Sequence, residues 1–443
     1  MRRARGPGMR VVVWSACALV GAGVIGCVGS DDAGPDPSPV AVGDVVVDGA
    51  SWTRIEDPDG VFGTRDEANV RLSDVVAGGP GYVAVGAFGQ GRHSDEGTVA
   101  AVWTSVDGAT WERVPHDDEV FGALGVDRLT VATAVTAGGP GLVAVGSEAR
   151  GEAWVALAWV SADGLDWTRV ELDDPRERGA TDLGLHAIAA TDDGLVTVGI
   201  ERGDPTGVPE YPAAWRSTDG TDWTPITLIP PEDAAAWGYL STVAGHDGEV
   251  IAAGASDGPD GQRWVATVWH GSGTDGLTRI PHDDEVFGGA GMPWIHGLTT
   301  GGPGLVAVGT VDSHHLDDPP WSPAAVWTSP DGAIWERVTH DDEVFGDGHD
   351  ATMYDVVATE WGLVAVGERV PGRDDPAQMR FVGTVWNSPD GLSWTRLDDE
   401  GETFAVDGHT SLTAITSGPN GLVVVGGVGA GDGTTIGAVW TSP

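Results

Sequence analysis

The sequence contains no lysine and only two cysteines, and both shortages limit what this protein can be. All 23 basic residues are arginines, and four of them lie within residues 1–10. The remaining 19 arginines face 67 acidic residues, a net charge near −48. This charge repels nucleic acid and anionic lipid, so we expect no nucleic-acid partner. Because both cysteines precede residue 28, the rest of the chain has no disulfide framework and no cysteine-based zinc site.

Tyrosine is also scarce, with four residues in 443, whereas glycine (69 residues) and tryptophan (20 residues) are abundant. Apolar runs are short and are separated by frequent turn signals. Short strands between glycine-rich turns are typical of all-β proteins. The composition therefore predicts an all-β chain.

The first 26 residues are expected to be a lipoprotein signal peptide. Residues 1–10 are basic, and the apolar run over 11–26 is shorter than the roughly 20 residues of a transmembrane helix. The run closes on Val-Ile-Gly-Cys, which resembles the lipobox of bacterial lipoproteins. That resemblance implies a diacylglycerol on Cys27 and an extracytoplasmic, lipid-anchored protein at the cell membrane. Plain secretion and a retained anchor are the alternatives. Residues 27–46, rich in Asp, Pro, Gly and Ser, are expected to be a flexible linker.

A string of the type G-[LY]-V-x-V-G, once in the looser form GEVIAAG, recurs through the rest of the chain. The glycines that close its seven copies are spaced by 53–60 residues: Gly86, Gly146, Gly199, Gly254, Gly309, Gly367 and Gly426. A fixed period of this length indicates a solenoid or a propeller. Each repeat reads as four short strands, of which the second is apolar on both faces.

The third and fourth strands of a repeat are joined by the hairpin motif S-x-D-G-x-x-W. It resembles the Asp-box, or BNR, repeat of sialidase-like propellers, with one residue fewer between Asp and Gly. The resemblance implies a structural role, in which the Ser and Asp oxygens accept turn N–H groups while Trp packs beneath. The matching positions are Ser105, Asp107 and Trp111; Ser161, Asp163 and Trp167; Ser217, Asp219 and Trp223; Ser329, Asp331 and Trp335; and Ser388, Asp390 and Trp394.

These repeats predict a seven-bladed β-propeller with four-stranded blades over residues 47–443. The last repeat ends in AVWTSP, whereas the matching half-motif VDGASWTRI stands alone at 47–55. We therefore expect the last blade to take its outer strand from the N-terminal side of the domain. This arrangement would close the ring without leaving an open sheet edge.

The acidic segment HDDEVFG occurs three times, at 116–122, 282–288 and 340–346. Paired carboxylates are compatible with weak calcium binding, since hard cations take oxygen ligands. Adjacent aspartates chelate one ion poorly, however, and the segment recurs loosely in other connections. Turn capping is the interpretation we favour, and we expect no cofactor apart from weakly bound Ca²⁺. The weak metal candidates are Asp117, Asp118, Asp283, Asp284, Asp341 and Asp342.

The loops between the second and third strands vary most between repeats and supply the candidates for ligand binding. The adjacent histidines at 314 and 315 lie beside two aspartates, and an exposed polar loop is favoured there over a zinc site. Aromatic residues of these loops, together with Trp294, are candidates for a platform that binds sugar rings or peptide. The ligand-binding candidates are His314, His315, Trp321, Trp264 and Tyr211.

Two functions from different classes fit the sequence. The first is a non-catalytic binding or assembly module, monomeric, with a protein or glycan ligand on its loop face. The second is a glycoside hydrolase of the sialidase type. The resemblance would then imply six blades, an arginine triad and a Tyr–Glu nucleophile pair. Seven repeats and a strongly acidic chain favour the first function, and no catalytic residue is assigned.

Overall fold

The computed structural model describes residues 52–57, 59–64, 68–90, 97–123, 128–151, 153–172, 182–203, 210–231, 237–259, 261, 264–289, 292–312, 322–346, 350–371, 380–397, 403–404, 409–429 and 434–443. The expected signal peptide, the linker and Cys27 lie outside these residues. Strands dominate the described part of the chain, whose two helices have four residues each. Neither helix in that part has the length and hydropathy needed to cross a membrane.

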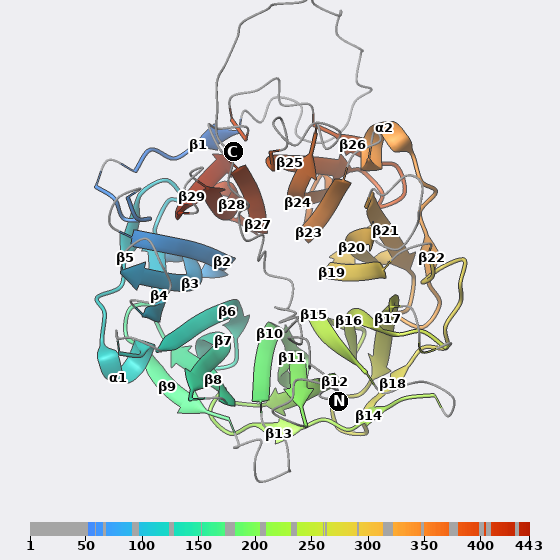
Figure 1. Cartoon of the computed structure of the whole chain (residues 1–443), viewed down its shortest axis with the longest axis horizontal. Helices are drawn as coiled ribbons and strands as arrows, with labels where there is room; N and C mark the ends of the chain where they lie inside the picture. Colours follow the sequence, from blue (N-terminus) through green and yellow to red (C-terminus); the bar gives the residue numbers. More distant parts are fainter. Residues whose placement is uncertain are drawn as a thin grey trace, which may run out of the picture.

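The strands form antiparallel units arranged around a central axis (Figure 1). Unit 1 consists of β2 (Ala68–Gly78), β3 (Gly81–Gln90), β4 (Thr98–Ser105) and β5 (Trp111–Arg113). Unit 2 consists of β6 (Leu129–Gly138), β7 (Gly141–Arg150), β8 (Ala153–Ser161) and β9 (Thr168–Glu171). A single parallel residue pair, Thr98 with Leu129, joins these two units into one eight-stranded sheet.

The following units repeat this order. Unit 3 contains β10 (Asp182–Thr191), β11 (Gly194–Arg202), β12 (Glu210–Ser217) and β13 (Thr224–Pro225). Unit 4 contains β15 (Gly238–His246), β16 (Glu249–Asp257), β17 (Trp264–Gly271) and β18 (Leu277–Arg279). Unit 5 contains β19 (Met292–Gly301), β20 (Gly304–Asp312), β21 (Ala324–Ser329) and β22 (Glu336–Arg337). Unit 6 contains β23 (Asp350–Thr359), β24 (Gly362–Val370), β25 (Val382–Ser388) and β26 (Thr395–Arg396).

Unit 7 is built from both ends of the described chain. It contains β27 (His409–Gly418), β28 (Gly421–Gly429), β29 (Thr435–Ser442) and, as its outer strand, β1 (Thr53–Arg54). Strand β1 pairs antiparallel with β29, with Thr53 opposite Thr441. The predicted all-β propeller, and the predicted closure of its last blade by the N-terminal strand, are confirmed.

Unit 4 differs from the others in having a fifth strand. Strand β14 (Leu228–Ile229) pairs in parallel with the outer strand β18. This repeat, which reads WHGSGTDGLTRI, lacks the tryptophan that ends the motif S-x-D-G-x-x-W. The apolar connection from unit 3 lies along its outer edge instead. Leu277 at this edge is fully buried and donates its backbone N–H to the carbonyl of Thr227, at 2.9 Å.

The hydrophobic core lies between neighbouring units. One cluster joins Val83 of unit 1 to Leu142 and Trp159 of unit 2. Another joins Trp103 of unit 1 to Val425 of unit 7, so packing as well as strand pairing closes the ring. Each unit therefore buries its faces only against its neighbours, as expected for blades of a propeller.

The connections HDDEVFG fasten one unit to the next. Two of them contain a short helix, α1 (Asp118–Phe121) and α2 (Asp342–Phe345). Phe121 and Phe345 are buried, and so are Phe62, Phe287 and Phe404 of the other connections. A tryptophan of the following unit donates its indole N–H to the residue before each phenylalanine, as Trp159 does to Val120 at 2.7 Å. Trp237, which precedes β15 in the connection to unit 4, is by contrast 43% exposed.

Five of the hairpin motifs form the same hydrogen-bonded turn. In unit 1, Ser105 Oγ accepts the N–H of Gly108 at 2.8 Å, and Asp107 Oδ1 accepts those of Ala109 and Thr110 at 2.9 and 2.7 Å. The Trp111 indole N–H donates to the carbonyl of Gly108 at 2.8 Å. The same bonds hold the turns that begin at Ser161, Ser217, Ser329 and Ser388.

Asp107→Ala is expected to lower the free energy of unfolding by about 1 kcal/mol, because two turn N–H groups lose their acceptor. The matched control is Asp275→Ala in unit 4, where no hydrogen bond to the carboxylate occurs among the described residues. Urea denaturation of both variants measures the difference. An equal loss in the two variants would show that this carboxylate is not what holds the turn.

Each inner strand carries a β-bulge at the same place, and this bulge explains the repeated glycines. In unit 5 the pairing of β19 with β20 shifts between Ile295 and Gly297, and Gly309 lies opposite Ile295. A Cβ atom on Gly309 would lie well inside 3.0 Å of the Trp294 carbonyl oxygen. The same obstruction, by the carbonyl two residues before the bulge, exists at all seven repeat glycines: Gly86, Gly146, Gly199, Gly254, Gly309, Gly367 and Gly426. Glycine is therefore required there by close backbone approach rather than by a positive φ angle.

Candidate functional site

A cavity of about 370 Å³ lies at the centre of the ring, between the inner strands. Two rings of residues line it, each with one residue from every unit. The first ring is formed by the bulge residues themselves: Ser73, Thr133, His186, Ser241, His296, Tyr354 and Thr413. The second ring is formed by the residues that follow them: Asp74, Ala134, Ala187, Thr242, Gly297, Asp355 and Ala414. The cavity has the volume of a small-molecule site.

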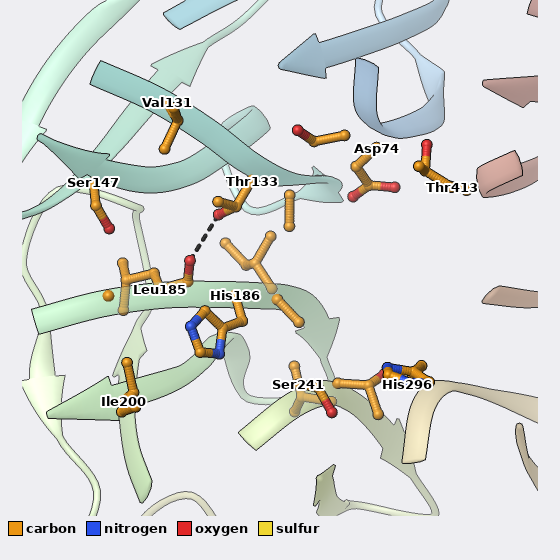
Figure 2. A pocket seen from close by; sticks show the side chains of 18 of the residues that line it. Asp74, Val131, Thr133, Ser147, Leu185, His186, Ile200, Ser241, His296 and Thr413 are labelled. Carbon is orange, nitrogen blue, oxygen red and sulfur yellow. Dashed lines mark hydrogen bonds between the residues drawn. The ribbon is translucent and has the colours of Figure 1, made fainter. Parts of the chain in front are cut away.

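Hydroxyl groups of the bulge ring tie three pairs of neighbouring units together. Thr133 Oγ1 donates to the carbonyl of Leu185 at 2.8 Å, as Figure 2 shows, and Ser241 Oγ donates to that of Ile295. Thr413 Oγ1 donates to Leu72 at 2.9 Å, across the closure between units 7 and 1. These three hydroxyl groups bond neighbouring units to each other. Not every residue of the bulge ring can therefore bind a ligand.

Two histidines of the bulge ring are uncharged at neutral pH. His186 Nδ1 lies 2.8 Å from the carbonyl of Leu240, which fixes this nitrogen as the donor. Burial lowers the pKa of His186 to about 4 and that of His296 to about 3. Neutral imidazoles carry no positive charge to attract an anion, and the histidine side of the cavity therefore suits an uncharged ligand better than an anion.

The second ring is small in five units and acidic in two. Asp74 Oδ1 accepts the N–H of Val75 at 2.7 Å, and Oδ2 accepts that of Val135 in unit 2 at 2.8 Å. Asp355 is held in the same way by Val356 at 2.8 Å and by Ile415 of unit 7 at 2.9 Å. Both carboxyl groups are thus fixed at the cavity wall by backbone donors.

Both carboxyl groups hold their protons unusually tightly. Burial, together with the nearby charge of Asp355, raises the pKa of Asp74 to about 8, against the opposing effect of its two backbone hydrogen bonds. Burial raises the pKa of Asp355 to about 6, against the opposing effect of its two backbone hydrogen bonds. At neutral pH the first side chain is therefore a carboxylic acid and the second a carboxylate.

Aromatic rings form a continuous arc along units 3 to 6. The ring of Tyr239 lies 6.3 Å from His186 and 4.6 Å from Trp294, measured between centroids. Trp294 stacks on His296 at 4.9 Å, and His296 lies edge-on to Tyr354 at 5.5 Å. Of these rings, those of His186, His296 and Tyr354 line the cavity, whereas Tyr239 is buried and neither it nor Trp294 is among the lining residues.

A tyrosine–glutamate pair ends the arc. Tyr354 donates its hydroxyl to Glu368 Oε1 at 2.8 Å, and burial raises the pKa of Glu368. Among the described residues that line the cavity, two are arginines, Arg71 and Arg202. Arg202 is held by Glu210, which accepts from Nε at 2.8 Å and from Nη2 at 2.6 Å. Three converging arginines, as a sialidase-type site requires, are therefore not found in this part of the chain.

The metal candidates of the HDDEVFG segments are used separately rather than together. Asp117 Oδ1 accepts the N–H of Glu119 at 2.8 Å and caps α1, whereas Asp118 contacts the His116 ring at 2.9 Å. The other two segments repeat this division, with Asp283 and Asp341 on backbone N–H groups and Asp284 and Asp342 on histidine rings. No group of three or more metal-ligating side chains occurs among the described residues.

The predicted ligand-binding residues are only partly placed. Trp264 packs against Tyr239, with centroids 5.5 Å apart, and so adjoins the aromatic arc. Tyr211 is 37% exposed on β12 and lies outside the cavity lining. His314, His315 and Trp321 lie outside the described residues. The structure therefore brings Trp264 together with Trp294 but not with Tyr211.

Sequence reasoning missed the cavity carboxyl groups. Asp74 and Asp355 follow positions that carry Ser and Tyr, and neither belongs to a local motif. A signal was nevertheless present, because aligning the repeats on their closing glycines places Asp in two units and small residues or Thr in the other five. Only the bulge shows that this position faces the centre.

Comparison with known proteins supports the fold. No protein-family model and no curated protein matches the chain. Among solved structures, a Trypanosoma rangeli sialidase in complex with sialic acid is 14% identical, with a TM-score of 0.50, covering 89% of this chain and 59% of that one. A Penicillium chrysogenum α-L-arabinanase complexed with arabinobiose is 12% identical, with a TM-score of 0.43, covering 88% and 98%. At these identities the sialidase shows a similar fold alone, and nothing is inferred from the arabinanase.

Proposed function

We propose that this protein is an extracytoplasmic module, anchored by lipid at Cys27, that binds an uncharged glycan unit in its central cavity without cleaving it. The observation that carries the proposal is the asymmetry of the cavity. The rings of His186, His296 and Tyr354, from units 3, 5 and 6, line a cavity whose wall also carries hydroxyl and carboxyl groups. Sugars are bound by this combination, in which ring faces cover C–H groups while polar side chains bond hydroxyls. We propose a monomer with no cofactor beyond weakly bound Ca²⁺.

The full-length protein is expected to bind at least one member of a panel of neutral methyl glycosides, measured by isothermal titration calorimetry. Ala187→Phe, which fills the cavity, is expected to weaken that binding at least tenfold, since the added ring occupies ligand volume. The matched control is Leu392→Ala, an exposed residue on a hairpin turn. Thermal unfolding checks that both variants fold. Equal binding by the three proteins would place the glycan elsewhere, and no binding would refute the proposal.

A second candidate function, glycoside hydrolysis of the sialidase type, is favoured by one observation, the Tyr354–Glu368 pair beside the cavity. The engagement of Arg202 by Glu210 weighs against it, because that guanidinium already has a carboxylate partner. Hydrolysis of fluorogenic glycosides by the parent protein, abolished in Tyr354→Phe, would replace the binding function with this one. We expect no turnover.

A further inference from the structure

Asp74 and Asp355 occupy equivalent places in units 1 and 6, with unit 7 between them. The scaffold itself does not require a carboxyl group there, because the other five units fill the position with Ala134, Ala187, Thr242, Gly297 and Ala414. Both aspartates line the same cavity, and both remain partly accessible at its wall. A feature that two of the seven units carry, and that lines the central cavity in both, points to a ligand rather than to a requirement of the repeat.

The carboxyl groups are held rigidly but keep bonding capacity. Each oxygen accepts one backbone N–H, at 2.7 to 2.9 Å, and every carboxyl oxygen can take part in a second hydrogen bond. Because the donors come from two neighbouring units, the side chains cannot turn away from the cavity without breaking those bonds. The pair is therefore set in place before a ligand arrives, which reduces the entropic cost of binding.

We propose that Asp74 and Asp355 are the specificity-determining pair of the central cavity, Asp74 donating a hydrogen bond to an uncharged, hydroxyl-bearing ligand and Asp355 accepting one from it. This inference rests on the proposed function of the cavity and names the ligand class that it takes. Neighbouring hydroxyls of a sugar match such a pair, since each hydroxyl both donates and accepts. A carboxylate-bearing ligand would bring a second negative charge beside Asp355.

The roles of donor and acceptor follow from where the single proton of the pair resides. With the pKa of Asp355 near 6 and that of Asp74 near 8, the pair carries one proton between those pH values. Strand β6, which faces Asp74 from unit 2, contributes no titratable side chain. The other titratable or charged side chains around the cavity are Arg71 on β2, Asp182 and His186 on β10, Arg202 on β11, His296 on β19 and Tyr354 on β23.

The first experiment needs no ligand. Carboxyl ¹³C NMR of the aspartate-labelled protein is expected to show two side chains titrating well above the usual range of about pH 4, in separate steps. Asp355→Asn is expected to remove the lower step and to shift the upper step downwards, because Asp74 then loses a negative neighbour. If every aspartate titrates below pH 5, or if the upper step does not move, the pair does not exist and the inference falls.

The second experiment measures recognition with defined probes. Methyl glycosides of glucose, galactose and mannose are compared with methyl glucuronide and sialic acid by calorimetry at pH 7. The neutral probe that binds is expected to lose about tenfold or more in affinity in Asp74→Asn and in Asp355→Asn. The charge-matched control, Asp222→Asn on an exposed turn, is expected to change affinity less than twofold.

The outcomes separate this inference from the proposed function. Tighter binding of glucuronide or sialic acid than of the neutral probes overturns the inference while leaving glycan binding intact. A neutral probe that binds equally well to all variants does the same. Failure of every probe to bind refutes glycan recognition, and with it the specificity assigned to the pair, whatever the titration shows. The inference is supported if the affinity for a neutral probe is highest between pH 6 and 8 and is lost in both asparagine variants.

Discussion

Gly309→Ala is expected to destabilise the folded protein by about 3 kcal/mol or more. The added Cβ would lie well inside 3.0 Å of the Trp294 carbonyl oxygen, which is a backbone atom on the adjacent strand. A flexible side chain could move aside, but this carbonyl is fixed by the bulge between Ile295 and Gly297. Relief of the clash therefore requires β19 and β20 to separate, which breaks the pairing at the centre of unit 5.

Urea denaturation compares Gly309→Ala with a matched variant, Gly89→Ala. Gly89 also lies within a strand, on β3, but a Cβ there would meet its nearest neighbour, Thr98 Oγ1, at an ordinary 3.4 Å. The control is expected to change stability by less than about 1 kcal/mol. If the two variants lose equal stability, the repeated glycines serve chain flexibility rather than close approach, and the account of the bulge is wrong.

The fold was predictable from sequence because the same strand and turn pattern recurs in every repeat. The period of the closing glycines marks the units, and the half-motif at 47–55 matches the incomplete repeat that ends at Pro443. The pairing of Thr53 with Thr441 confirms the closure that this match predicted. Where the repeat decays, prediction was weaker. The parallel strand β14 at the edge of unit 4 has no counterpart in the other repeats, so periodicity gave no sign of it.

The cavity was harder to predict because a bulge shifts the register of every inner strand. Alternation along LSDVVAG assigns Ser73 and Val75 to one face and Asp74 to the other. The extra residue at the bulge directs both Ser73 and Asp74 toward the centre, where they meet residues more than 280 positions away. No local pattern of residue types encodes that meeting. The loops are easy to single out in the sequence because they differ visibly between repeats. Two aspartates among small residues do not stand out in the same way.

The parent protein is expected to lose stability as pH rises, and Asp74→Asn is expected to lose much of that dependence. The pKa of Asp74 is about 8 in the folded protein against 3.8 for an unfolded chain. The folded state therefore keeps a proton that the unfolded state has lost, so the stabilisation is complete below pH 4 and disappears as pH rises through 8. Over that range the effect of this one group is on the order of 5 kcal/mol.

The window from pH 7 to 8 isolates Asp74 from the other shifted groups. Asp355, with a pKa of about 6, has completed most of its titration below that window. His186 and His296, with pKa values of about 4 and 3, act in the opposite direction and only below the ordinary histidine pKa of 6.5. The free energy of unfolding of the parent, measured by urea denaturation, is therefore expected to fall by about 1 kcal/mol more than that of Asp74→Asn across this unit of pH.

Asparagine also replaces one carboxyl oxygen by an NH₂ group, which then faces the N–H of Val75 or of Val135, so Asp74→Asn is expected to be less stable than the parent at pH 5. The two stability curves consequently converge as pH rises, because the parent alone must ionise a buried acid. Parallel curves from pH 5 to 8 would mean that Asp74 is already ionised at pH 5. It would then be a structural tie between units 1 and 2 and not a donor in the cavity.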